Sequence, residues 1–236
     1  MKETFLGVDV STHGYTELLK RLMNDIDEKR NAFIVAINPE KVMKAQQDEE
    51  LKTLLNKATY QIPDGIGVVL ASILKGGKIR ERVTGIDMML RLCEESAKQG
   101  KKVFLYGAKP GIADAARKKL EEIYPTIQIV GTMNGYEKDQ EVIKNAINES
   151  KADIVFVALG SPTQEYWIIN NMEQLHASVF QGVGGSFDVV SGRLKRAPMF
   201  FQKIGLEWFY RLVKEPWRWR RQLILPSFLW KVLRKN

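Results

Sequence analysis

Short runs of apolar residues alternate along this chain with longer segments in which apolar residues recur every three or four positions. The short runs have strand length and are rich in β-branched residues, so they predict buried strands at residues 32–37, 102–106, 127–131, 153–159 and 179–183. The periodic segments predict amphipathic helices, for example over residues 112–123. Strands that alternate with helices predict an α/β fold, a Rossmann-like and mostly parallel sheet with helices on both faces.

The first part of the chain predicts one more strand, over residues 5–10, and a helix from about residue 15 to residue 29. Asp25 and Asp27 have the Asp-x-Asp spelling of metal-dependent sugar transferases. They lie inside the predicted helix rather than after a strand. We therefore expect both side chains on a solvated helix face.

Glycine-rich turns follow several of the predicted strands. Gly107 follows one strand, Gly160 the next but one, and Gly184 and Gly185 the last. The carboxyl ends of parallel strands meet at one edge of the sheet, where backbone N–H groups bind ligands, often phosphorylated ones. One such turn is an ordinary strand-to-helix connection, whereas several together favour a ligand site. The turn at Gly107 lacks the full Gly-x-Gly-x-x-Gly pattern, so a dinucleotide is only weakly indicated.

Polar residues also stand at predicted strand ends, and each has two interpretations. Asn38 either caps the following helix or contacts a substrate, and Asp64 either caps a helix or acts as a general base. Arg82 belongs to a basic connector and either lies in a solvated loop or binds phosphate. Thr84 or Asp87 is expected to cap the helix that follows. Tyr136 either covers a base or seals the core.

Charge and tryptophan are concentrated at the carboxyl end of the 236-residue chain. Residues 199–236 hold nine basic and two acidic residues, nearly the whole net charge of +8, and four of the five tryptophans. We therefore divide the chain into residues 1–198 and an appendage, residues 199–236. Interleaved aromatic and basic residues favour an anionic membrane surface. A helix packed on the core and a nucleic-acid contact are the alternatives, and the apolar content of the appendage argues against nucleic acid.

Other features narrow the class of protein. Cys93 is the one cysteine, so no internal disulfide is possible, in keeping with a reducing compartment. We expect no signal peptide, because no basic segment followed by a long apolar run opens the chain. No stretch approaches the roughly 20 apolar residues needed to span a bilayer.

Motifs spread over essentially the whole chain carry a resemblance to a known family. They are Asn38-Pro39-Glu40, Pro63-Asp64-Gly65, residues 82–87, Gly131 with Asn134-Gly135-Tyr136, residues 160–167, residues 182–188, Arg196-Ala197-Pro198, Glu207-Trp208, Arg211-Leu212, Glu215-Pro216, Arg218 and Arg221. In this order they resemble the bacterial glycosyltransferases of the TagA/WecG/CpsF family. One position departs from the pattern, because many relatives carry threonine where this chain has Ala36. A substrate contact made there in relatives is therefore not assumed.

The resemblance implies transfer of N-acetylmannosamine from its UDP donor to undecaprenyl-diphosphate N-acetylglucosamine, with inversion and a β-1,4 linkage. It places this reaction in the synthesis of wall teichoic acid linkage units or a related surface polysaccharide. Asp64 is then the expected base, Asn38 a substrate contact, and Arg82 and Gln164 neighbours of the diphosphate leaving group. The expected donor-binding residues are Gly107, Asn134, Gly135, Tyr136, Gly160, Gly184, Gly185, Phe187, Asp188, Arg211, Arg218 and Arg221.

The resemblance also bears on cofactors, partners and location. We expect no cofactor and no obligatory metal, because no Asp-x-Asp stands at a strand end and positive side chains would replace the metal. We expect a peripheral protein at the cytoplasmic face of the plasma membrane, docked through the appendage, which also offers a surface for a second subunit. Another UDP-sugar, such as UDP-ManNAcA or UDP-glucose, and a non-catalytic UDP-sugar-binding module are the alternatives.

Overall fold

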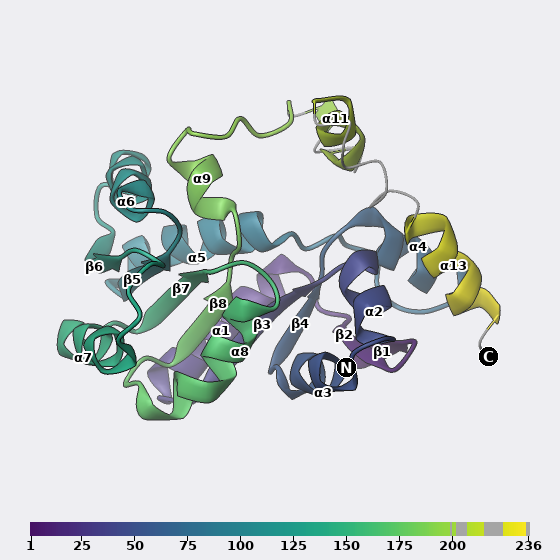
Figure 1. Cartoon of the computed structure of the whole chain (residues 1–236), viewed down its shortest axis with the longest axis horizontal. Helices are drawn as coiled ribbons and strands as arrows, with labels where there is room; N and C mark the ends of the chain where they lie inside the picture. Colours follow the sequence, from purple (N-terminus) through teal and green to yellow (C-terminus); the bar gives the residue numbers. More distant parts are fainter. Residues whose placement is uncertain (199, 202–206, 215–223, 235–236) are drawn as a thin grey trace.

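The computed structural model describes residues 1–198, 200–201, 207–214 and 224–234. Within them, six parallel strands form one sheet in the order β4-β3-β8-β7-β5-β6 (Figure 1). In chain order these strands are β3 (Ala32–Ile37), β4 (Tyr60–Pro63), β5 (Lys102–Gly107), β6 (Gln128–Met133), β7 (Ile154–Ala158) and β8 (Val179–Gly182). The α/β fold expected from the apolar runs is confirmed.

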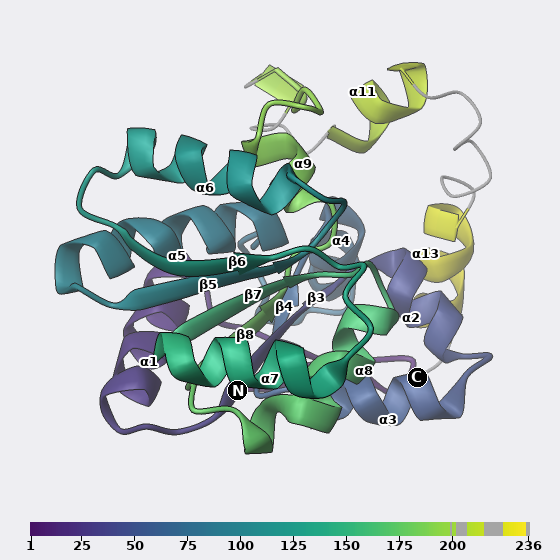
Figure 2. The same cartoon turned by 60° about the vertical axis from the view of Figure 1, so that its left-hand side comes forward.

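Helices cover both faces of this sheet (Figure 2). One face packs against α1 (Tyr15–Asp27), α5 (Gly85–Gln99), α6 (Ile112–Ile123) and α9 (Ser186–Val190). The other packs against α2 (Pro39–Ala45), α3 (Glu49–Lys57), α4 (Ile66–Leu74), α7 (Gln140–Ser150) and α8 (Thr163–Asn171), which a short turn, η1 (Met172–Gln174), extends. Strand β7 shows why the central strands are apolar throughout, since Val155 faces the α8 side and Phe156 the α5 side.

The start of the chain is a hairpin rather than the single strand expected over residues 5–10. Strand β1 (Lys2–Phe5) pairs antiparallel with β2 (Val8–Ser11). The two residues between them, Leu6 and Gly7, have φ angles of 51° and 83°. Both are therefore in the left-handed region, which reverses the chain in the middle of the apolar run.

Helix α1 forms as predicted, but its two acidic residues differ in environment. Asp27 is exposed and pairs with Lys101, as expected for a solvated face. Asp25 is buried, which contradicts the prediction. Its Oδ1 pairs with Arg30 Nη2 at 2.8 Å, and its Oδ2 accepts a hydrogen bond from the Tyr60 hydroxyl at 2.6 Å. Asp25 thus ties α1 to strand β4.

Two helices of the appendage are described, α11 (Glu207–Lys214) and α13 (Ile224–Arg234). Helix α13 packs against α2 and α4, with Phe228 and Val232 buried in the core. The Phe228 ring lies 6.4 Å from that of Phe5. Helix α11 stands at the same end of the molecule as α9 in both views (Figures 1 and 2). Across the described ranges, every helix is too short or too polar to span a membrane.

Candidate active site

The carboxyl ends of β3 and β4 place Asn38 and Asp64 next to each other. The backbone N–H of Asp64 donates to the Ile37 carbonyl at 2.8 Å, and a Cβ built on Gly65 would lie 3.8 Å from that of Asn38. Asn38 caps α2, since its Oδ1 accepts the Lys41 backbone N–H at 2.9 Å. Asp64 is half-buried in the turn. The edge of the sheet therefore offers a carboxylate and an amide side by side.

Arg82 is brought to the same place by the start of α5. The Val83 N–H donates to the Pro63 carbonyl at 2.9 Å, which fixes the connector against the end of β4. Thr84 caps α5, as one alternative predicted, by accepting the Asp87 N–H. A Cβ built on Gly85 would lie 3.5 Å from the Ala36 Cβ, so the position at which this chain departs from the family pattern adjoins the start of α5.

Arg82 belongs to a cluster of four charged side chains. Its Nη2 pairs with Glu207 Oε2 at 3.0 Å, and the other oxygen of Glu207 accepts from Arg196 Nε at 3.1 Å. Arg196 also makes a bidentate contact with Asp87, at 2.6 and 2.8 Å. Of the two interpretations of Arg82, the solvated loop is wrong, because its side chain is mostly buried in an ion pair.

The pKa values of the cluster follow from its geometry. Burial alone would raise the pKa of Asp87, but the hydrogen bonds from Arg196 and Thr84 and the charges of Arg196 and Arg82 hold it below the ordinary value. Burial alone would lower the pKa of Arg196, but its contacts with Asp87 and Glu207 raise it. Asp87 therefore stays ionised over the neutral pH range.

A second polar network joins three loops of the edge. Glu165, fully buried at the start of α8, accepts Lys41 Nζ at 2.9 Å and Gln164 Nε2 at 3.0 Å through Oε1. Gln164 Oε1 in turn accepts the Gly184 backbone N–H at 2.9 Å. The other oxygen of Glu165 has no hydrogen-bond partner among the described residues. Neither Lys41 nor Glu165 was identified as a site residue from the sequence. The one available signal was that Glu165 lies in the residue 160–167 motif.

The predicted donor-binding residues at the carboxyl ends of β5 and β6 lie farther along the same edge. Gly107 has a φ angle of 117°, and a Cβ there would lie 2.5 Å from the Ala158 carbonyl oxygen, so only glycine fits. Gly135 donates its N–H to the Ala108 carbonyl, and Asn134 Oδ1 accepts the Tyr136 N–H. Tyr136 is 63% exposed and therefore does not seal the core.

The remaining predicted residues have different environments. Gly160 and Gly185 stand where a Cβ would meet open space. Phe187 is fully buried in the core, so it offers no surface to a ligand in this structure. Asp188 is half-buried, with Arg193 Nε 3.9 Å from its Oδ1. Arg211 lies on α11, although its side chain is not among the described parts of the structure. Arg218 and Arg221 lie outside the described residues.

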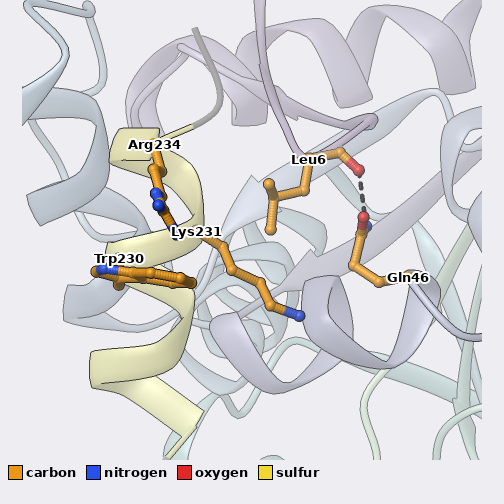
Figure 3. Close-up of a pocket in the computed structure, with 5 residues that line it drawn as sticks. All are labelled: Leu6, Gln46, Trp230, Lys231 and Arg234. Carbon is orange, nitrogen blue, oxygen red and sulfur yellow. Dashed lines mark hydrogen bonds between the residues drawn. The ribbon is translucent and has the colours of Figure 1, made fainter.

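Two pockets lie away from this edge. One, of about 420 Å³, is lined by Leu6, Gln46, Trp230, Lys231 and Arg234 (Figure 3). The other, of about 380 Å³, lies between α3 and α8. No group of three histidine, cysteine, aspartate or glutamate side chains in the described parts of the chain is arranged to hold a metal ion.

Comparison with known proteins gives consistent matches along the chain. The model of the Glycosyl transferase WecG/TagA/CpsF family matches residues 3–236. A protein of Bacillus subtilis (strain 168) is 40% identical over 211 residues, which cover 89% of this chain and 82% of the relative. A protein of Staphylococcus aureus (strain MW2) is 33% identical over 233 residues, covering 98% and 92%. Both relatives are named N-acetylglucosaminyldiphosphoundecaprenol N-acetyl-beta-D-mannosaminyltransferase.

Proposed function

The chain belongs to the WecG/TagA/CpsF family of glycosyl transferases, and from that membership we propose that it transfers N-acetylmannosamine from UDP-ManNAc to undecaprenyl-diphosphate N-acetylglucosamine. It is a hexosyltransferase, like the relatives that it matches over most of their length. Their names support the transferred sugar and the lipid acceptor for this chain. The UDP donor is supported by the family pattern and by the glycine turns at the sheet edge. The product would serve wall teichoic acid linkage-unit synthesis or a related surface polysaccharide.

Asp64 is the proposed general base. The acceptor hydroxyl must lose its proton as its oxygen attacks the anomeric carbon of the donor. One displacement inverts that carbon and gives the β-1,4 linkage, while UDP leaves with the bonding electron pair. Asp64 stands half-buried at the end of β4, beside Asn38. Asn38 already caps α2 through Oδ1, so its NH₂ group remains to orient the acceptor.

The leaving diphosphate is proposed to lie near Arg82 at the start of α5. The amino end of this 15-residue helix carries partial positive charge, which adds to that of the guanidinium. We propose that such positive groups take the place of a metal, with Arg211, Arg218 and Arg221 of the appendage closing over the diphosphate. Gln164 acts through Gly184, because its carbonyl oxygen holds the N–H of that turn.

The uridine is proposed to lie farther along the edge, over β5 and β6. The exposed ring of Tyr136 is available to stack on the base, and Asn134 and Asp188 are available to the base and ribose. The turns at Gly160 and Gly185 leave open space for the donor, whereas Gly107 and Gly135 let the neighbouring loops of this edge pack closely together.

We further propose that the protein docks peripherally on the cytoplasmic face of the membrane, where its lipid acceptor resides. Trp230 is 58% exposed on α13, and the Arg234 guanidinium stacks over its ring at 4.6 Å. Ile73 and Leu74 are exposed on α4, against which α13 packs. Apolar side chains with basic neighbours suit the interface of an anionic bilayer.

The observation that carries the proposed reaction is the meeting of Asp64, Asn38 and Arg82 at one sheet edge in a chain that matches the family throughout. The test is UDP release from UDP-ManNAc, with and without a short-chain polyprenyl-diphosphate N-acetylglucosamine. Asp64→Asn is expected to abolish acceptor-dependent release while UDP binding survives. Asp27→Asn, an exposed carboxylate on α1, is the matched control. If acceptor-dependent release occurred only with a different UDP-sugar, the family assignment would stand, and UDP-ManNAc would be refuted as the donor.

A further inference from the structure

The carboxylate of Glu207 lies between two arginines that are distant from each other in sequence. Its Oε2 pairs with Arg82 Nη2 at 3.0 Å and its Oε1 with Arg196 Nε at 3.1 Å. The side chains of Arg82 and Arg196 are only 18% and 17% exposed. Two oxygens of a phosphate group can satisfy two guanidinium groups in the same way. The pair therefore has the charge and spacing of an anion site.

Arg196 is held in place without Glu207. Its two terminal nitrogens both bind Asp87, at 2.6 and 2.8 Å, and Asp87 accepts the Thr84 hydroxyl at 2.7 Å. Loss of the Glu207 contact would thus leave Arg196 in position. The four side chains sum to zero charge, and without Glu207 the cluster would carry one net positive charge.

The cluster adjoins the candidate base. Arg82 is followed by Val83, whose N–H binds the Pro63 carbonyl immediately before Asp64. An anion held by Arg82 and Arg196 would therefore lie beside the end of β4, where the reaction is proposed. Glu207 reaches this place as the first residue of α11, so its carboxylate can leave the two arginines by a change of side-chain rotamer or with a shift of α11.

We propose that Arg82 and Arg196 form a binding site for a diphosphate group of the substrates, and that Glu207 occupies this site in the free protein as an intramolecular competitor. The inference rests on the proposed function and extends it in two respects. Arg196 becomes a ligand of the diphosphate, and binding of the diphosphate displaces the Glu207 carboxylate from the two arginines.

The test is calorimetric binding of inorganic pyrophosphate and of UDP to the full chain and to Glu207→Gln. Removing the competing charge is expected to tighten the binding of both ligands on the order of tenfold, because the anion no longer has to displace a carboxylate. Glu94→Gln, which removes a surface charge at the far end of α5, is the matched control and is expected to change neither. Arg196→Lys keeps the charge but loses the bidentate contact with Asp87, and is expected to weaken the binding of both ligands several-fold.

Thermal melting of each variant establishes that it is folded, and Glu207→Asp, which shortens the reach of the carboxylate, provides a second variant with an expected intermediate gain. Unchanged or weaker pyrophosphate binding by folded Glu207→Gln and Glu207→Asp would overturn the inference. The role of Glu207 would then be to hold α11 in place. If Glu94→Gln tightened pyrophosphate binding equally, the inference would also be overturned, because the gain would then be a general effect of net charge. These results are separate from those that test the proposed reaction, which is measured as acceptor-dependent UDP release by the unmodified chain.

Discussion

Gln164 accepts the backbone N–H of Gly184 at 2.9 Å and thereby ties the loop after β7 to the turn after β8. The same side chain donates to Glu165, so both ends of its amide are engaged inside the protein. Gln164 therefore contributes to the site by holding the glycine turn in place. Its remaining capacity to contact a diphosphate directly is limited to one N–H.

Gln164→Ala is expected to lower kcat about tenfold and to leave the fold intact. The Gly184 N–H loses its partner, and loss of one such hydrogen bond costs about 1–3 kcal/mol when the group stays buried. The measurement is acceptor-dependent UDP release beside a denaturant titration. Gln174→Ala, on the turn after α8, is the matched control. Full activity in Gln164→Ala would show that the turn keeps its conformation unaided.

Gly182→Ala tests the space beside this amide. A Cβ at Gly182 would lie 2.6 Å from Gln164 Nε2, so the amide must move and the protein is expected to lose about 1–3 kcal/mol. Adding Gln164→Ala removes the clash, so the double variant is expected to be more stable than the sum of the two single changes predicts. Gly185→Ala, where a Cβ meets open space, is the control for stability. Additive effects would mean that the backbone of β8 shifts instead.

Lys41→Met is expected to destabilise the protein by about 3–5 kcal/mol, because it leaves the fully buried Glu165 carboxylate without its cation. Urea titration measures this loss. Lys41→Met combined with Glu165→Gln is expected to recover much of it, because no unpaired charge remains. Lys44→Met, an exposed change on the same helix, should be within about 0.5 kcal/mol of the unmodified chain. A loss no larger than that of Lys44→Met would refute the buried-pair interpretation.

Asp87 gives a prediction about pH. Its pKa lies below the ordinary value of 3.8 in the folded chain, so its interactions stabilise the protein above that value and are lost as the pH falls through the folded-state pKa. Asp87→Asn is therefore expected to melt lower than the unmodified chain at pH 7. The gap between the two melting temperatures should narrow at pH 3. A gap that is constant over this range would show that the charge of Asp87 is immaterial.

The sequence predicted the parts of the molecule that depend on local pattern. The central strands were found because strands covered on both faces are apolar throughout, as in Val155 and Phe156 of β7. The hairpin was missed because an apolar run does not reveal that Leu6 and Gly7 reverse the chain. Asp25 was misplaced because its partner Tyr60 belongs to another element.

The candidate site also contains some residues that the sequence predicted and others that it did not. Asn38 and Asp64 were predictable because the ends of parallel strands align at one edge. Lys41 with Glu165, and Arg82 with Glu207, pair across 124 and 125 residues. Such pairs depend on the tertiary arrangement, and local periodicity carries no signal for them.

Membrane docking is tested by removing the charge of α13 while its buried face is kept. Lys231 and Arg234 are exposed, whereas Phe228 and Val232 hold the helix on the core. Each basic residue near an anionic surface contributes about 1 kcal/mol, so Lys231→Gln with Arg234→Gln is expected to weaken binding to anionic vesicles roughly 30-fold. Co-flotation with vesicles of phosphatidylglycerol measures the effect, and neutral vesicles should bind neither protein well. Lys118→Gln with Lys119→Gln, on α6, is the matched control for net charge. If both double variants floated equally, membrane attraction would follow the overall charge of the protein, and α13 would have no special part in it.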